Sequence, residues 1–355
     1  MGLSETLQGL TTRYFSPGEK AKAGIINQIC QEAYGTGGRT EFYEVEALLS
    51  SLKSELSITD SGNLDDYVAE MKRNIQTVVM VVDMLVLEQC DQPDYVKVKS
   101  TPLRERKVSH NFPLCGGIAY GQQRSAHSLG SGFFLEKDMI ATAAHVIIRP
   151  GLDIESLRFV HGIRITGPND YRTEIRVHKS QVFKPSSGSL SHQQHYLSEM
   201  GSDFAVLKVE PAYEYAASPY VKEVRFPADI KAYNSLFKAE SIEGRGVYGV
   251  GHGLSLPLKV SYGGRIIHAP KTFPYFETDL NLVGGNSGSP VFDSETHELV
   301  GIYVRGTKKL QLKDSGHCLE VKMEHIPSSL NDVEGQECQR LEAVWAAAQW
   351  LRQQK

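Results

Sequence analysis

Hydrophobic residues recur at helical spacing over about the first ninety residues, where three helices are expected. Ser16 is placed to cap the amides of the first helix, which ends at Gly35. The second is expected from about Glu41 to Leu56, and the third from about Asn63 to Leu87. This pattern predicts a small all-α bundle at the N-terminus.

The pattern changes from Cys115 onward, where short apolar or alternating runs are separated by Gly, Pro, Asn and Ser. Many short strands with frequent turns predict an all-β sandwich or barrel. Helical spacing returns between Glu337 and Arg352. We therefore expect a helical domain at 1–93, a linker at 94–110, a β-rich domain at 111–330 and a C-terminal helix within 331–355.

Charge and hydropathy narrow the classes of partner. The net charge is -4, and no long basic stripe is available to neutralise phosphates, so no nucleic-acid partner is expected. The most apolar run, Val78 to Leu87, is too short to span a bilayer, which needs about 20 residues. We interpret this run as part of a buried helix and expect no membrane partner.

The N-terminus and the cysteines point to a cytoplasmic location. Residues 1–5 lack the basic and apolar regions of a secretory signal. The five cysteines are widely spaced, without a zinc-type pattern, so neither a metal nor another cofactor is expected. Unpaired cysteines and the missing signal fit a reducing compartment.

Three motifs carry candidate chemistry. Thr142-Ala143-Ala144-His145 ends a predicted strand, Asp203 leads into an apolar strand, and Gly285-Asn286-Ser287-Gly288 precedes another. Taken singly, each motif has an ordinary interpretation: His145 as a surface or core histidine, Asp203 as a turn residue, and the Ser287 motif as a glycine-rich loop. Taken together, each beside a strand and in the order His, Asp, Ser, they predict a catalytic triad.

The chemistry explains this combination of residues. A serine hydroxyl needs an adjacent base to remove its proton, and the pKa of histidine suits that role. A carboxylate on the other ring nitrogen holds the imidazole in one tautomer. A tight glycine-rich turn can direct two amides at the oxyanion, and Gly285 and Ser287 are the expected donors.

These motifs resemble those of the trypsin-like serine proteases. Gly130 to Val146 resembles their strand-and-histidine segment, and Gly284 to Phe292 resembles the nucleophile loop of the bacterial branch that includes glutamyl endopeptidases. Gly251 to Lys259 is similar to a group of bacterial, signal-less members. The resemblance covers about Cys115 to Ile326. It implies a mainly β fold of two six-stranded antiparallel barrels, with the active site in the cleft between them.

The resemblance also implies which residues bind substrate. Asn281 and Leu282 occupy the positions that form the floor of the primary specificity pocket in this family. Neither is acidic, which argues against a preference for substrates with Arg or Lys before the scissile bond. Tyr303 stands where glutamyl endopeptidases have the histidine that binds an acidic substrate side chain. The pocket is therefore expected to take an uncharged substrate residue. Val304, Arg305 and Gly306 match the edge strand that pairs with substrate backbone.

Regulation is expected from outside the triad. Asn286 stands where the animal enzymes have the aspartate that pairs with a freshly cut N-terminal amine, and an amide cannot form that ion pair. The helical segment is either a packing extension or an adaptor or inhibitory module that takes a protein partner. Signal-less trypsin-like domains fused to helical modules resemble effectors of bacterial conflict and antiphage systems.

The sequence thus predicts a regulated cytosolic serine endopeptidase that cleaves a protein substrate through an acyl-enzyme. Two alternatives stay open. One is a protease-like binding or scaffold module with a blocked site, in which the N-terminal helices are the working part. The other is an esterase that uses the same triad.

Overall fold

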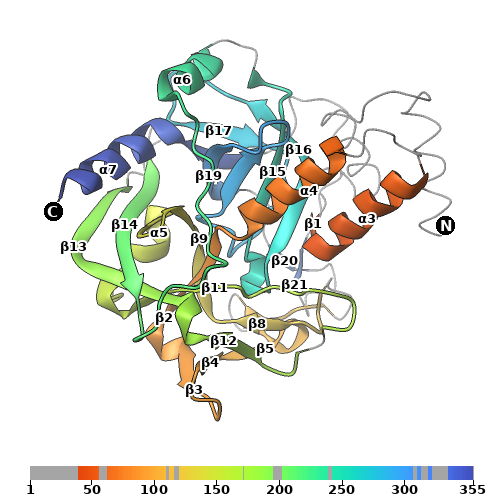
Figure 1. The fold of residues 1–355 in the computed structure, drawn as a ribbon, viewed down its shortest axis with the longest axis vertical. Helices are drawn as coiled ribbons and strands as arrows, with labels where there is room; N and C mark the ends of the chain where they lie inside the picture. Colours follow the sequence, from red (N-terminus) through yellow and green to blue (C-terminus); the bar gives the residue numbers. More distant parts are fainter. Residues whose placement is uncertain are drawn as a thin grey trace.

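The computed structural model describes residues 39–55, 62–108, 112–115, 120–170, 172–194, 202–238, 242–306, 310–312, 319–321 and 335–354. Two six-stranded antiparallel β-barrels form the body of the protein, with helices before and after them, as predicted (Figure 1). The expected first helix, from Ser16 to Gly35, lies outside the described residues.

The first barrel is a closed ring of antiparallel strands. Alternate side chains of each strand face its interior, where Val79, Phe134, Phe159 and Leu207 are buried. In ring order, the strands are β10 (Met139–Thr142), β14 (Asp203–Pro211), β13 (Val182–Gln194), β11 (Leu157–His161), β2 (Val78–Asp83) and β9 (Ser128–Glu136).

The second barrel is closed by the pairing of β16 with β17. A seventh strand, β1 (Arg39–Thr40), pairs with Val260 and Ser261 of β16, on the edge away from β15. In ring order, the strands are β16 (Lys259–His268), β15 (Gly246–Gly251), β18 (Pro290–Asp293), β19 (Leu299–Gly306), β22 (Gln336–Arg340) and β17 (Tyr275–Thr278).

Two of the expected helices differ from the sequence prediction. The third helix was expected to reach Leu87, but α4 (Gly62–Ile75) ends before β2, so the helical interpretation of Val78 to Leu87 is wrong. The β-branched run in β2 pairs on one side with β9 and on the other with β11. Residues from the expected helical segment therefore complete the first barrel, while the division into separate domains remains a prediction.

The N-terminal helices pack against the second barrel (Figure 1). Val45, Leu48 and Leu49 of α3 (Phe42–Glu55) share one hydrophobic core with Met71 of α4 and with the barrel residues. Polar contacts reinforce this packing. The Asn74 side-chain amide donates to Tyr248 Oη and to the His297 carbonyl, both at 2.8 Å.

The C-terminal helix α7 (Leu341–Gln353) returns to the first barrel. The helix was expected from Glu337, but residues 336–340 form β22, because their backbones pair with both β17 and β19. Figure 1 shows α7 beside β13 and β14, and the Lys208 ammonium donates to the Gln354 carbonyl at 2.7 Å. The helix thus ties the two barrels together.

Shorter elements surround the barrels, and several lie in the expected linker 94–110. The remaining helices are α5 (Ala144–Ile147) and α6 (Ile230–Lys238). The remaining strands are β3 (Leu87–Gln89), β4 (Tyr95–Val98), β5 (Ser100–Pro102), β6 (Lys107–Val108), β7 (Phe112–Pro113), β8 (Arg124–Ala126), β12 (Ile175–His178), β20 (Leu310–Leu312) and β21 (Leu319–Val321).

Two further expectations concern membranes and cysteines. Within the described part of the chain, no helix combines the length and the apolar character that a bilayer crossing needs. Cys115 is disulfide-bonded, whereas Cys90 and Cys338 carry free thiols. The expectation that the cysteines are all unpaired is therefore wrong at Cys115.

Candidate active site

His145 and Asp203 are in direct contact. His145 lies in α5, one turn of helix that follows β10, and Asp203 is the first residue of the neighbouring strand β14. Asp203 Oδ2 is 2.6 Å from His145 Nδ1, and Oδ1 accepts the His145 backbone N–H at 3.0 Å. The His145 side chain is 28% exposed and that of Asp203 only 6%, so the carboxylate is covered while the ring still reaches the surface.

Gln339 supports Asp203 from the other barrel, a role that the sequence analysis missed. Its Oε1 accepts the Asp203 backbone N–H at 3.0 Å. Its Nε2 donates to the carbonyls of Pro274, at 3.0 Å, and Arg340, at 3.2 Å. A buried glutamine of β22 is thus fixed at both ends, and it links the start of β14 to the second barrel.

Ser287 lies in the turn before β18, against strand β9. The Ser131 amide donates to the Ser287 carbonyl at 2.8 Å, and the Gly288 amide donates to the Tyr303 carbonyl at 2.8 Å. The Ser287 hydroxyl points to the Val304 carbonyl, at 3.3 Å, and no hydrogen bond joins it to His145. The structure therefore brings the serine turn beside the histidine strand, with the hydroxyl turned toward β19.

Two glycines allow this close approach. Gly288 has a φ of +89°, and a Cβ there would collide with the Ser131 carbonyl and with Thr142 Oγ1. A Cβ on Gly130 would lie 2.7 Å from the Val146 side chain and 2.8 Å from the Ser287 carbonyl. Gly130 therefore sits between the residue that follows His145 and the backbone of Ser287.

The turn from Gly284 to Ser287 leaves two backbone amides without a partner in the part of the chain that the structure describes. Gly285 has a φ of +95°, and Asn286 folds back so that its backbone and side-chain amides donate to the Val283 carbonyl at 3.0 and 3.1 Å. The amides of Gly285 and Ser287 donate to no other group among the described residues. They are therefore available to a ligand oxygen.

A buried hydroxyl fixes this turn to a second loop. Ser131 Oγ donates to the Gly285 carbonyl at 2.9 Å and accepts the His252 backbone N–H at 3.0 Å. The Leu254 amide adds a bond to the Gly284 carbonyl at 2.7 Å. Residues 252–256 lie between β15 and β16, and these hydrogen bonds hold them to the turn that carries the candidate oxyanion amides.

His252, whose backbone N–H donates to Ser131 Oγ, has a neutral imidazole. The ring is fully buried, and its Nδ1 lies 3.0 Å from the Leu256 carbonyl, so Nδ1 carries the proton and donates it. Burial lowers the pKa of His252 to about 4, because desolvation disfavours the imidazolium. Its Nε2 is buried without a partner among the described residues.

The expected substrate-binding residues divide into two groups. The side chains of Leu282 and Tyr303 lie in the core of the second barrel, where Leu282 packs beside Gly249 of β15. Asn281 is also buried, and its backbone N–H donates to Ser261 Oγ at 2.9 Å.

The second group, residues 304–306, forms the C-terminal end of β19, beside the turn that carries Ser287. Val304 is a bulge residue, while Arg305 pairs with Glu337 and Gly306 with Gln336 of β22. Strand β18 ends its pairing opposite Ile302, so residues 304–306 extend past it.

Arg149 was also missed by the sequence analysis. Its Nε donates to the His145 carbonyl at 2.8 Å, and its Nη2 donates to the Leu129 carbonyl at 3.1 Å. One guanidinium thus holds the end of the histidine helix to the strand that carries Gly130. Its only sequence signal is a position four residues after His145.

No cluster of three or more potential metal ligands occurs within the ranges that the structure describes. The polar groups gathered here are instead a carboxylate, an imidazole, a hydroxyl and two amides. Such a set can move a proton and hold an oxyanion.

Comparisons with known proteins give two similar solved structures and one matching family model. Two solved structures of Rv3671c from M. tuberculosis H37Rv, one a serine-to-alanine mutant and both described as inactive forms, are similar to the chain. Each is 12% identical with a TM-score of 0.38, over 80% of this chain and 90% or 92% of the other. No curated protein sequence matches the chain. Residues 130–302, which contain His145, Asp203 and Ser287, match the family model of the trypsin-like peptidase domain.

Proposed function

We propose that this chain is a serine endopeptidase that hydrolyses peptide bonds of a protein substrate through an acyl-enzyme. The observation that carries the proposal is the contact between the Asp203 carboxylate and His145 Nδ1, at 2.6 Å, within the matched peptidase segment. This contact leaves Nε2 as the basic atom of the ring, on the side away from the carboxylate.

The reaction begins with the Ser287 hydroxyl. In the proposed step, Oγ leaves the Val304 carbonyl for His145 Nε2, which receives its proton as Oγ attacks the substrate carbonyl carbon. The negative charge moves to the carbonyl oxygen and is held by the amides of Gly285 and Ser287. His145 then gives the proton to the leaving amine, and the C–N bond breaks.

Water completes the cycle. It attacks the acyl-enzyme while His145 accepts one of its protons, and the same proton returns to Ser287 Oγ as the ester bond breaks. Asp203 stays ionised throughout and stabilises the imidazolium that forms in each half-reaction. The chemistry of these steps uses only side chains and amides of the chain.

Substrate binding is proposed at β19 and beside the serine turn. Residues 304–306 extend past the end of β18, and an extended substrate segment would pair with this part of the strand. Asn281, Leu282 and Tyr303 give the proposed pocket region no acid, in keeping with an uncharged residue before the scissile bond. The buried positions of Leu282 and Tyr303 make them supports of the pocket wall.

Labelling of the serine tests the catalytic proposal. We expect a fluorophosphonate to modify Ser287 of the full chain, and Ser287→Ala to lower peptidase turnover by roughly 10⁶-fold with the fold intact. Ser235→Ala, a change of an exposed serine in α6, is the matched control. Absence of both labelling and peptide cleavage in the wild-type protein would indicate the binding or scaffold alternative, and cleavage of esters alone would indicate an esterase.

We also propose that the enzyme is a regulated cytoplasmic protease of a bacterial antiviral defence system, with a protein partner that acts through the N-terminal helices. Support comes from the resemblance to signal-less fused proteases, and the packing of α3 and α4 on the second barrel would let a partner bound to these helices act on the barrel. The test is to incubate the wild-type and Ser287→Ala proteins with lysates of phage-infected and uninfected bacteria and to sequence the new peptide termini. Identical cleavage in the two lysates would contradict this role.

A further inference from the structure

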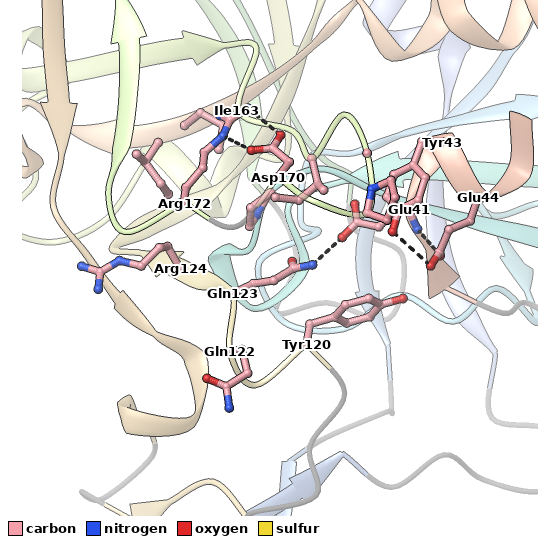
Figure 2. Close-up of a pocket in the computed structure, with 15 residues that line it drawn as sticks. Glu41, Tyr43, Glu44, Tyr120, Gln122, Gln123, Arg124, Ile163, Asp170 and Arg172 are labelled. Carbon is pink, nitrogen blue, oxygen red and sulfur yellow. Dashed lines mark hydrogen bonds and ion pairs between the residues drawn. The ribbon is translucent and has the colours of Figure 1, made fainter. Parts of the chain in front are cut away.

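A cavity of ≈ 220 Å³ lies apart from the candidate active site, where the N-terminal segment meets both barrels (Figure 2). Three segments build most of its wall: residues 41–44 at the start of α3, residues 120–124 before β8, and residues 163–170 and 172–175, which follow β11 and reach the first residue of β12. Pro257, next to β16, adds the second barrel. None of the lining residues belongs to the proposed triad.

Glu41 presents a carboxylate oxygen without a partner at this cavity. The residue is 2% exposed, and its Oε1 accepts from Gln123 Nε2 at 2.7 Å and lies 2.8 Å from the Lys259 ammonium. Oε2 is buried and has no hydrogen bond among the described residues. A buried acceptor left unpaired costs about 1–3 kcal/mol, and more when charged, so a donor placed there is stabilising.

Lys259 cannot supply that second bond. Its ammonium already donates to Gln123 Oε1 at 2.8 Å and to the Pro257 carbonyl at 2.7 Å, beside its contact with Glu41 Oε1. Burial outweighs these partners and raises the pKa of Glu41 above its ordinary value. The carboxylate therefore has unused capacity to accept a hydrogen bond and a positive charge.

The other charged groups of the wall are committed to the protein. Asp170 accepts two bonds from Arg172, at 2.7 and 2.9 Å, and Glu44 accepts from Thr40 and from the Glu41 amide. Arg124 donates to the carbonyl and hydroxyl of Ser100, and Figure 2 shows its guanidinium pointing away from Glu41. Apart from Lys259, which already contacts Glu41 Oε1, no cationic side chain among the described lining residues is directed at Glu41, so Oε2 remains as an acceptor and an anionic ligand is disfavoured.

The rest of the wall suits an apolar stem. Ile163, Ile165, Pro168 and Pro257 supply aliphatic surface. Tyr43 and Tyr120 add aromatic rings, and the Lys259 ammonium already lies 4.8 Å from the centroid of the Tyr120 ring. Aromatic faces attract ammonium and guanidinium groups, so the wall can hold both parts of an alkyl cation.

We propose that this cavity binds an alkylguanidinium or alkylammonium group, whose N–H donates to Glu41 Oε2 while its methylene stem packs on the isoleucines and prolines. The group comes either from a small amine or from an arginine or lysine side chain of a peptide. A bound cation bridges the start of α3 to the connection between β11 and β12. The site does not depend on Ser287 being a nucleophile.

Titration calorimetry of the full-length protein with n-butylguanidinium tests the proposal, and n-butylurea is the uncharged control of the same shape. We expect one molecule of n-butylguanidinium to bind per chain and n-butylurea to bind at least tenfold more weakly. An N-acetylated Gly-Arg-Gly amide, titrated in parallel, separates the two sources: tighter binding than n-butylguanidinium indicates a peptide, and weaker binding indicates a small amine. Equal binding of n-butylurea, or no binding of either cation, overturns the proposal.

Glu41→Gln locates the site, because it removes the charge and keeps the shape. We expect it to weaken n-butylguanidinium binding at least tenfold. Glu46→Gln, on the same helix in a surface pair with Lys72, should leave binding unchanged. If Glu41→Gln does not fold, a crystal structure of the wild-type protein with n-butylguanidinium decides: a guanidinium nitrogen at hydrogen-bond distance from Glu41 Oε2 supports the site, and its absence from the cavity overturns it.

Discussion

Asp203 holds His145 at two points, the ring nitrogen Nδ1 at 2.6 Å and the backbone N–H at 3.0 Å. The two carboxylate oxygens thus fix both the orientation of the imidazole and the start of the short helix that carries it. Because Oδ2 can only accept, Nδ1 must be the protonated atom. The contact therefore determines the tautomer as well as the position of the proposed base.

Asp203→Asn should lower kcat toward a peptide substrate by roughly 10⁴-fold while the protein stays folded. The new amide can donate to Nδ1, which would place the ring proton on Nε2 and remove its basicity toward Ser287. Asp138→Asn, an exposed change in the turn between β9 and β10, is the control. A kcat within tenfold of wild type for Asp203→Asn would count against the proposed mechanism.

Gln339→Leu should lower the free energy of unfolding by about 1–3 kcal/mol, because the buried Asp203 amide loses its acceptor. As a positioning residue, Gln339 should affect kcat more than KM. Urea denaturation and steady-state kinetics measure the two effects, with Gln353→Leu at the exposed end of α7 as control. Unchanged stability and kinetics would show that the contact between the barrels does not position Asp203.

Gly288→Ala should destabilise the protein and abolish peptidase activity. The φ of +89° imposes strain of about 1–3 kcal/mol on alanine, and the new Cβ collides with the Ser131 carbonyl, at a further cost of about 1–3 kcal/mol. Gly167→Ala is the control, since no atom lies within 4 Å of a Cβ there. Thermal unfolding of both variants compares the costs, and equal melting temperatures would contradict this interpretation.

Stability should fall as the pH is lowered from about 6.5 toward 4. Burial lowers the pKa of His252 to about 4, whereas an unfolded histidine titrates near 6.5. Between these values the unfolded state binds a proton that the folded state excludes, so the free energy of unfolding decreases. The difference between the folded and unfolded pKa values of His252 corresponds to about 3 kcal/mol in the free energy of unfolding.

Urea denaturation of wild type and His252→Asn at pH 8, 6 and 5 measures this linkage. The variant should show the shallower decrease below pH 6.5, even if it is less stable at every pH. Parallel profiles for the two proteins would mean that His252 does not carry the effect. His161 and His297, whose pKa values burial also lowers to about 4, account for the slope that remains in the variant.

The strand-rich character of the chain was predictable from local sequence because its signals are local, whereas the two six-stranded barrels were expected only from the resemblance to trypsin-like proteases. Short apolar runs separated by turn residues indicate strands, and the three motifs at strand ends indicated a shared site. The pairing of His145 with Asp203 agrees with that prediction, although the catalytic role of the residues stays a proposal.

Contacts between segments that are distant in the sequence could not be predicted from local sequence patterns. The run Val78–Asp83 is apolar throughout, and only its pairing with β9 and β11 makes it a strand. Gln339 is an ordinary polar residue in sequence, and its importance arises because the end of β22 meets the start of β14. Glu41 gave no signal either, because its charge is buried only when Lys259 lies opposite.

Strand β1 introduces a delay in the biogenesis of the protein. Arg39 pairs with Ser261 and Thr40 with Val260, so the first described strand must wait for β16 to leave the ribosome. The first barrel, from β2 to β14, can close earlier, while the apolar faces of α3 and α4 still lack their covering surface. Until the second barrel is translated, these apolar faces stay open to solvent, a condition that favours aggregation of the nascent chain.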